Sequence, residues 1–285
     1  MESDSAGNIR RGGGDIMRLT INGTSYHYEV YGKGIPLVLL HGFTGSTATW
    51  YPFIKEWQDS LQLILIDLPG HGKTGVRQPF SMKECCDDLK EIFTQLGLTS
   101  INLLGYSMGG RTALSFAMFY PEMIQSLILE SSSPGLKNAT DRVKRMKHDE
   151  KLASRIERKG VEAFVDFWED IPLFHTQKGL PLKKQQAIRQ ERLAQTKEGL
   201  AASLRYMGTG SQPSWWNNLG EVSFPVLLLA GMLDEKFADI NEEMSERFIN
   251  FVLHLFVDTG HAIHVEQDEN FGKIIKEFIL AQEEK

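Results

Sequence analysis

The stretch Ile101-Asn102-Leu103-Leu104-Gly105-Tyr106-Ser107-Met108-Gly109-Gly110-Arg111 decides the fold of this chain. An apolar run typical of a buried strand ends in Gly-Tyr-Ser-Met-Gly, and a helical pattern follows it to Tyr120. The pattern G-x-S-x-G between a strand and a helix is typical of a nucleophile elbow, in which small residues let strand and helix approach and the serine hydroxyl is exposed. A glycine-rich turn with an ordinary surface serine would carry the same five residues, so the rest of the chain has to decide.

Strand-like runs and helical patterns alternate on both sides of this stretch. The continuous apolar runs expected to be buried strands are Pro36–Leu40, Leu61–Asp67, Ile124–Glu130, Val226–Ala230 and Val252–Val257. Helical periodicity is found in Ser81–Leu96, Glu235–Phe248 and Gln267–Gln282. Such alternation predicts an α/β fold with a mostly parallel central sheet and helices on both faces. Ahead of it, alternating residues on either side of Asn22-Gly23-Thr24 predict a β-hairpin.

The pattern also divides the chain into regions. Residues 1–16 lack the apolar segment of a signal peptide, and we expect a flexible leader or an expression scar, with Met17 as an alternative natural start. Residues 17–133 and 221–285 carry the alternating pattern and are expected to form the core. Residues 134–220 are charged, mostly helical in pattern and poor in β-like runs. Because loops after the strands of such sheets carry the chemistry, this insertion is expected to be a cap, or lid, over the active site.

Composition excludes several classes of function. The 285 residues are 41% hydrophobic and 24% charged with a formal net charge of -6, as in a soluble globular protein. There is no basic stretch interleaved with aromatics for nucleic acid, and no apolar run of membrane-spanning length. Cys85 and Cys86 are neighbours on a predicted helix and point apart, so we expect free thiols in a reducing cytosol rather than a disulfide or a metal pair. No metal or cofactor is expected, and the chain is expected to be a monomer or a weak dimer.

A nucleophilic serine needs a histidine to accept its proton and an acid to hold that histidine. The sequence supplies both just past predicted strand ends: Asp234 in Gly-Met-Leu-Asp, and His261 in Asp-Thr-Gly-His. We predict that Ser107, Asp234 and His261 form a catalytic triad. Met108, which follows the serine, and Phe43, in the first strand-end loop, are expected to supply the two N–H donors of an oxyanion hole.

Each of these residues has a plainer alternative. Asp234 could simply cap the helix that begins at Glu235, and Asp239 is a second candidate acid although it lies inside that helix. His264 competes with His261, but it lies nearer the last predicted helix and is expected to pack there. The His-Gly pair before Phe43 could be no more than a flexible strand exit. Asp67 also follows a strand, but it precedes Ser107, so the chain order disfavours it as the acid. His71 is interpreted as structural in its glycine-rich turn.

Taken together, these motifs resemble the α/β-hydrolase superfamily, in which the triad follows the chain order serine, acid, histidine. The resemblance covers nearly the whole chain from Met17. More narrowly, several stretches are similar to the MenH family of the menaquinone pathway, the 2-succinyl-6-hydroxy-2,4-cyclohexadiene-1-carboxylate synthases. These stretches are His41-Gly42-Phe43-Thr44-Gly45-Ser46, Tyr106-Ser107-Met108-Gly109-Gly110-Arg111, Ser133-Pro134-Gly135-Leu136, Asp166-Phe167-Trp168 before Pro172-Leu173-Phe174, Ile188-Arg189-Gln190-Glu191-Arg192 and Asp234-Glu235-Lys236-Phe237.

The resemblance implies a lyase that eliminates pyruvate from an enolpyruvyl cyclohexene, a small substrate with three carboxylates. It also implies that Arg111, Arg145 and Arg192 bind these carboxylates and that Tyr106 and Trp168 line the site. The residues themselves allow other roles: Arg145 is spaced for a surface ion pair with Asp149, Arg189 rivals Arg192, and Trp168 could belong to the core of the cap.

Two rival functions use the same fold. A cap-bearing hydrolase, acting on esters or on carbon–carbon bonds, would need the same triad. A binding module without catalysis is disfavoured by a complete triad. Release of pyruvate distinguishes the lyase from both.

Overall fold

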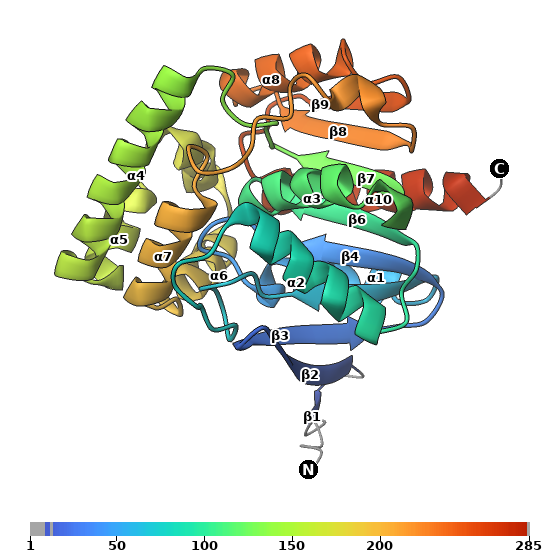
Figure 1. Ribbon diagram of the computed structural model, residues 1–285, viewed down its shortest axis with the longest axis horizontal. Helices are drawn as coiled ribbons and strands as arrows, with labels where there is room; N and C mark the ends of the chain where they lie inside the picture. Colours follow the sequence, from blue (N-terminus) through green and yellow to red (C-terminus); the bar gives the residue numbers. More distant parts are fainter. Residues whose placement is uncertain (1–8, 12–13, 284–285) are drawn as a thin grey trace.

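The computed structural model describes residues 9–11 and 14–283, and its centre is one twisted nine-stranded sheet (Figure 1). The strands lie in the order β1-β2-β3-β5-β4-β6-β7-β8-β9. Their bounds are β1 Ile9–Arg11, β2 Gly14–Ile21, β3 Thr24–Tyr31, β4 Ile35–Leu40, β5 Leu61–Ile66, β6 Ile101–Tyr106, β7 Ile124–Glu130, β8 Val226–Gly231 and β9 Phe251–Phe256. The first three strands are antiparallel to their neighbours and the other six are parallel, so the predicted mostly parallel sheet is confirmed.

Helices cover both faces of this sheet and create two hydrophobic cores. On one face lie α2 (Met82–Gln95), α3 (Met108–Phe119) and α8 (Glu235–Ser245). On the other lie α1 (Tyr51–Trp57) and α10 (Asp268–Glu283), preceded by the short α9 (Ile263–Glu266). The central strands are buried along both faces, which explains why they read as continuous apolar runs.

The predicted hairpin is present between β2 and β3. Asn22 has φ 48° and Gly23 has φ 81°, the two positive values that a tight two-residue hairpin turn requires. The turn brings Ile21 opposite Thr24 and fixes the register of both strands. An asparagine followed by a glycine is the pair that adopts this backbone most easily, so the turn follows directly from the sequence.

The expectation that residues 1–16 lie outside the fold is wrong for their described part. Residues 9–11 form β1, and β2 begins at Gly14, three residues before Met17. β3 continues past Tyr28, the residue opposite Met17, and Asp15 and Ile16 pair with this continuation. Without them, backbone groups along this edge of β3 would have no partner. The rest of the expected leader, residues 1–8 and 12–13, lies outside the described residues.

The segment between β7 and β8 is mostly helical and lies beyond one end of the strands, at the left in Figure 1. It contains α4 (Ala139–Lys159), α5 (Val161–Trp168), α6 (Leu182–Leu193) and α7 (Lys197–Met207), with the 3-10 segment Pro172–Gly179 between α5 and α6. These helices have a small apolar core of their own, against which the side chain of Phe43 packs. They occupy the segment for which a cap was expected, and we call them the cap below.

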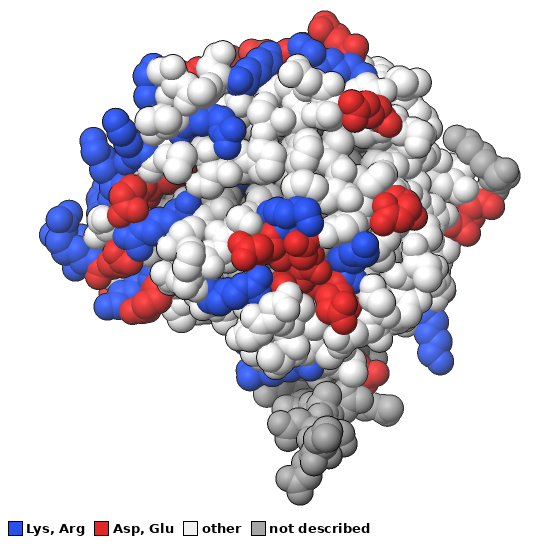
Figure 2. All heavy atoms as spheres, in the orientation of Figure 1, with Lys and Arg blue, Asp and Glu red and all other residues white. Residues whose placement is uncertain are grey.

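Charge is unevenly distributed over the molecule. Figure 2 shows many Lys and Arg side chains over the cap with Asp and Glu side chains among them, a second cluster of both signs near the middle of the face, and large uncharged areas between them. Helix α4 alone carries eight Lys and Arg against four Asp and Glu, although the whole chain has a formal net charge of -6.

The two cysteines lie side by side in helix α2. Cys85 and Cys86 are both buried on α2 and both free, and burial raises the pKa of each thiol. Within residues 9–11 and 14–283, no helix has the length and apolar character needed to cross a membrane.

Candidate active site

The serine lies in a strained turn between β6 and α3. Ser107 has φ 51° and ψ -104°, a conformation that residues with side chains rarely adopt. A Cβ atom at position 105 would lie 2.3 Å from the carbonyl oxygen of Gly109, and one at position 109 would lie 2.2 Å from that of Leu40. Only glycine fits at either position, so the two glycines of the motif allow strand and helix to approach and hold the serine at the turn.

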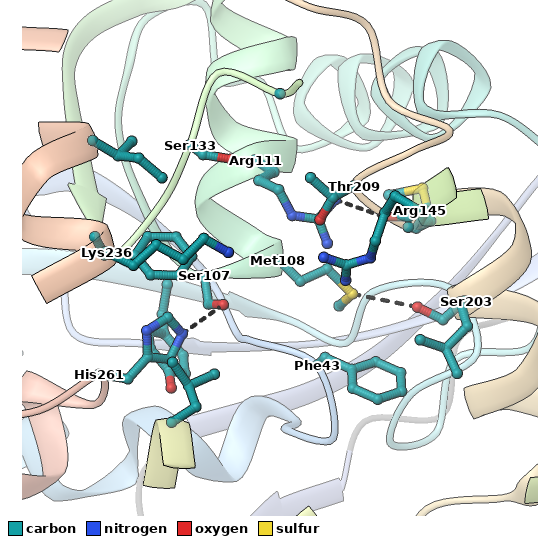
Figure 3. A pocket seen from close by; sticks show the side chains of 18 of the residues that line it. Phe43, Ser107, Met108, Arg111, Ser133, Arg145, Ser203, Thr209, Lys236 and His261 are labelled. Carbon is teal, nitrogen blue, oxygen red and sulfur yellow. Dashed lines mark hydrogen bonds between the residues drawn. The ribbon is translucent and has the colours of Figure 1, made fainter. Parts of the chain in front are cut away.

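Hydrogen bonds bring the three predicted triad residues together. Nδ1 of His261 lies 2.6 Å from Oδ2 of Asp234. Its Nε2 lies 2.9 Å from Oγ of Ser107, the contact drawn as a dashed line in Figure 3. An ionised carboxylate can only accept, so Nδ1 carries the proton and donates it to Asp234. Nε2 is therefore free to accept from the serine hydroxyl, which is the arrangement of a general base poised over a nucleophile.

The rival residues lie elsewhere. Asp234 precedes α8, but its side chain makes no capping hydrogen bond and is turned to His261 instead. Asp239 is exposed on α8. His264 donates to the buried carboxylate of Glu130, with Nδ1 2.8 Å from Oε1, and does not reach the serine pocket. Asp67 is structural, because its carboxylate accepts the backbone N–H groups of Thr47 and Lys73.

The loop after β4 is held in place by its histidine. Nε2 of His41 accepts the N–H of Leu68 at 3.0 Å, so Nδ1 carries the proton and donates to the Gly42 carbonyl at 2.7 Å. The C=O and N–H of a trans peptide point in opposite directions, so the N–H of Phe43 faces away from His41. Met108 begins α3 directly after the serine. The oxyanion-hole roles of Phe43 and Met108 stay predictions supported by these positions.

A cavity of about 200 Å³ opens in front of Ser107, between the sheet edge and the cap. Its wall is mostly apolar, with a few polar side chains close to the triad (Figure 3). The predicted residues that line it are Phe43, Tyr106, Ser107, Met108, Arg111, Arg145, Trp168 and His261. Trp168 also packs edge-on against Phe43, with ring centroids 5.5 Å apart, so it belongs both to the core of the cap and to the cavity. Its indole Nε1 is buried and has no hydrogen-bond partner among the described residues.

Three cations face this cavity from different elements: Arg111 from α3, Arg145 from α4 and Lys236 from α8. Arg111 donates to the Met207 carbonyl at 2.7 Å, and neither it nor Lys236 makes an ion pair with a described residue. Burial lowers the pKa of Arg111 to about 9, and the nearby charge of Arg145 adds to this. Asp149 lies close enough to Arg111, and Asp234 close enough to Lys236, to oppose part of these pKa changes, but neither carboxylate pairs with the cation directly. Two cations without a direct ion-pair partner at one cavity favour an anionic ligand.

Arg145 makes the predicted ion pair and also lines the serine cavity. Its Nε lies 2.7 Å from Oδ1 of Asp149, the ion pair expected from their spacing, and its guanidinium also lines the cavity. The pair is not an ordinary surface pair, because Asp149 is buried and its Oδ2 has no hydrogen-bond partner among the described residues.

Arg192 is not brought to the serine cavity. Its guanidinium stacks on Phe174 with 4.7 Å between the carbon Cζ and the ring centroid, donates to Gln177 and pairs with Glu169 at 3.5 Å. These contacts hold it in two neighbouring cavities, one of which shares Phe43, Tyr106 and Phe174 with the serine cavity. Its rival Arg189 pairs with Asp166 and Glu169 and also lies outside the serine cavity.

Sequence reasoning missed Lys236 as a site residue. The signal was present, because Lys236 stands two residues after the predicted acid, in the stretch Asp234-Glu235-Lys236-Phe237. Only the direction in which α8 leaves the sheet shows that a side chain at this position reaches toward Ser107 (Figure 3).

Comparison with known proteins agrees with this geometry. Residues 35–268 match the alpha/beta hydrolase fold family. A Bacillus subtilis (strain 168) protein provisionally named 2-succinyl-6-hydroxy-2,4-cyclohexadiene-1-carboxylate synthase is 48% identical over 248 residues, which cover 86% of this chain and 90% of that protein. MenH from S. aureus has a solved structure that is 38% identical, with a TM-score of 0.87, covering 90% of this chain and 99% of that one. A thermophilic esterase from Thermogutta terrifontis is 26% identical, with a TM-score of 0.84, covering 94% and 98% of the two chains. This chain therefore belongs to the alpha/beta hydrolase fold family and, within it, to the family of the 2-succinyl-6-hydroxy-2,4-cyclohexadiene-1-carboxylate synthases.

Proposed function

We propose that this protein is a lyase of menaquinone biosynthesis. It eliminates pyruvate from 2-succinyl-5-enolpyruvyl-6-hydroxy-3-cyclohexene-1-carboxylate and forms 2-succinyl-6-hydroxy-2,4-cyclohexadiene-1-carboxylate. The observation that carries the proposal is the cavity itself: a serine–histidine–aspartate triad faces cations without ion-pair partners across one small space. The identity of the substrate is inferred from relatives that are named for this product, one of them 48% identical to this chain.

The elimination needs a base at the carbon next to the succinyl ketone. Oγ of Ser107 removes that proton and passes its own proton to Nε2 of His261, across the 2.9 Å hydrogen bond. The ketone oxygen becomes an enolate oxygen, which the N–H groups of Phe43 and Met108 are placed to stabilise. The electron pair then forms the ring C2=C3 bond, the C3=C4 pair shifts to C4=C5, and the C5–O bond breaks. Enolpyruvate leaves and takes up a proton to become pyruvate, so the step consumes no co-reactant and needs no acyl-enzyme.

The cations and the indole of the cavity suit this substrate. Its three carboxylates require groups that stay charged in a partly dry space, and a guanidinium can bind both oxygens of one carboxylate. Arg111 and Arg145 lie on one side of the cavity, near each other (Figure 3). The unpaired Nε1 of Trp168 is a further donor that a carboxylate or carbonyl oxygen can satisfy.

The direct test is a pyruvate-release assay with the enolpyruvyl substrate, read through a coupled dehydrogenase and corrected for the enzyme-free rate. We expect saturable release that depends on Ser107. The same enzyme is offered a nitrophenyl ester. Ester hydrolysis without pyruvate release would overturn the proposal in favour of the second candidate, a cap-bearing carboxylesterase.

That second candidate rests on a specific observation. The Ser107–His261 hydrogen bond is also the geometry of a nucleophile that forms an acyl-enzyme, and the 26%-identical solved structure is named as an esterase. The cations distinguish the two candidates, because an uncharged ester gives Arg111 and Lys236 no partner for their charges.

A further inference from the structure

The family resemblance leaves one carboxylate of the substrate without a cation in this structure. It implies three arginines, but only Arg111 and Arg145 line the serine cavity, whereas Arg192 is held outside it by Glu169, Gln177 and Phe174. A third cation does line the cavity. It is Lys236, in the first turn of α8.

Lys236 enters the cavity from a different side than the arginines. In the view of Figure 3, its side chain extends from the left to a point near Ser107, while Arg111 and Arg145 lie to the right, above Met108. The carboxylate of Asp234, two residues earlier, accepts the 2.6 Å hydrogen bond from His261. Lys236 itself makes no ion pair with a described residue. Its ammonium therefore has no fixed anion and is free to meet one brought by a ligand.

We propose that Lys236 is a substrate-binding residue that holds one carboxylate of the substrate, and that it takes the part of the third cation in place of Arg192. This inference rests on the proposed function, since it assigns a partner to the third carboxylate of that substrate. It divides the site into two anion-binding sides, one formed by the arginines of α3 and α4 and the other by the lysine of α8.

The surroundings of Lys236 predict how this contact depends on pH. Burial against the cavity wall lowers the pKa of the Lys236 ammonium from its ordinary value of 10.5, Arg145 on α4 lowers it further, and Asp234 partly opposes the change. Besides Arg145, the other titratable groups that line the same cavity are Arg111 on α3, Tyr106 at the end of β6, and His261. The charge of Lys236 is present below its pKa and lost as the pH rises through it, so substrate binding weakens on the alkaline side.

The test compares Lys236→Met, Lys236→Arg and a control, Lys273→Met, whose lysine is exposed on α10. We expect Lys236→Met to raise KM about tenfold with a much smaller change in kcat. The effect should be smaller than for a buried pair, because Lys236 is exposed to water. Lys236→Arg should restore KM, and it should also remove part of the alkaline loss of kcat/KM. Any alkaline loss that comes from Arg111 stays in every variant, so the difference between variants reports on Lys236.

A binding measurement separates this inference from the proposed function. Calorimetry with the substrate on Ser107→Ala and on Ser107→Ala/Lys236→Met gives Kd without turnover, and the second protein should bind about tenfold more weakly. Unchanged KM in Lys236→Met together with unchanged Kd overturns the role of Lys236. A tenfold rise of KM in Arg192→Ala with none in Lys236→Met assigns the third cation to Arg192 and overturns it as well. Absence of pyruvate release by the wild-type enzyme overturns the proposed function alone, and the Kd comparison then still decides about Lys236.

Discussion

Replacing the acid of the triad by its amide is the sharpest test of the active-site geometry. Asp234→Asn keeps the size and shape of the side chain but removes the charge that lies 2.6 Å from Nδ1 of His261. If the amide nitrogen turns toward the ring and donates to Nδ1, the histidine proton moves to Nε2, which can no longer accept from Ser107. If the amide oxygen faces the ring, the geometry survives but the imidazolium formed during catalysis loses its counter-charge.

The size of the effect follows from the burial of this pair. Both side chains are almost completely buried, so water cannot replace the lost carboxylate. The loss of a charge-assisted hydrogen bond together with the wrong tautomer should lower kcat by about 10³-fold to 10⁴-fold, which corresponds to about 4–5.5 kcal/mol in activation free energy. KM should change little, because Asp234 does not line the substrate cavity.

The assay is steady-state pyruvate release, with thermal unfolding measured in parallel. The matched control is Asp239→Asn, five residues further on in helix α8 and exposed to solvent, which should retain wild-type kcat. The reasoning is refuted if Asp234→Asn folds with a normal Tm and keeps kcat within about tenfold of wild type, a loss of less than about 1.4 kcal/mol. Another acid would then have to orient the histidine.

Three other predictions follow from the same coordinates. Ser107→Ala and His261→Ala should each lower turnover about 10³-fold or more, and the double variant should be little worse than either, because the residues act as one unit; additive losses measured by pyruvate release would argue against a triad. Arg145→Ala should raise KM more than it lowers kcat, whereas Arg111→Ala, nearest the serine, should change both. Each variant should lose about 2–5 kcal/mol in kcat/KM if the substrate carboxylate stays buried. Unchanged kcat/KM in both variants would contradict the proposal that the substrate is anionic. Burial raises the pKa of the Glu29 carboxyl, but hydrogen bonds from a histidine and two tyrosines outweigh it and lower the pKa from 4.5 to about 2. The stability that Glu29 provides is therefore complete above pH 4.5 and lost as the pH falls toward 2. Glu29→Gln should therefore make Tm depend less on pH between 4.5 and 2. If Tm of this variant depends on pH as strongly as that of the wild type, these hydrogen bonds do not stabilise the carboxylate.

The features that sequence could predict are those with a short-range or ordered cause. The elbow around Ser107 follows from glycines that must sit two residues to either side, and the hairpin follows from Asn22-Gly23. The pairing of Asp234 and His261 could be predicted because parallel strands end at the same edge of a sheet, so residues far apart in the chain meet there.

The features that sequence missed depend on where side chains are held in three dimensions. Nothing in the order of residues shows that Glu169 and Gln177 hold Arg192 away from the serine, or that Asp149 is buried under Arg145. The same is true of Lys236, whose position depends on the angle at which α8 leaves β8. Residues 9–11 were missed because a short run with neighbouring glycines gives no strand signal of its own.

The uneven charge of the surface has a consequence for how substrate arrives. A chain with net charge -6 repels a trianion at long range, but α4 offers it a positive surface that continues inward to Arg145 at the cavity. Such a field guides diffusing anions toward one side of the molecule and raises the frequency of productive encounters. Screening by salt shortens its reach to about 8 Å at physiological ionic strength, so capture of substrate becomes slower as ionic strength rises while the elimination step itself is unaffected. Helix α4 thus gives an acidic protein a local attraction for an acidic substrate.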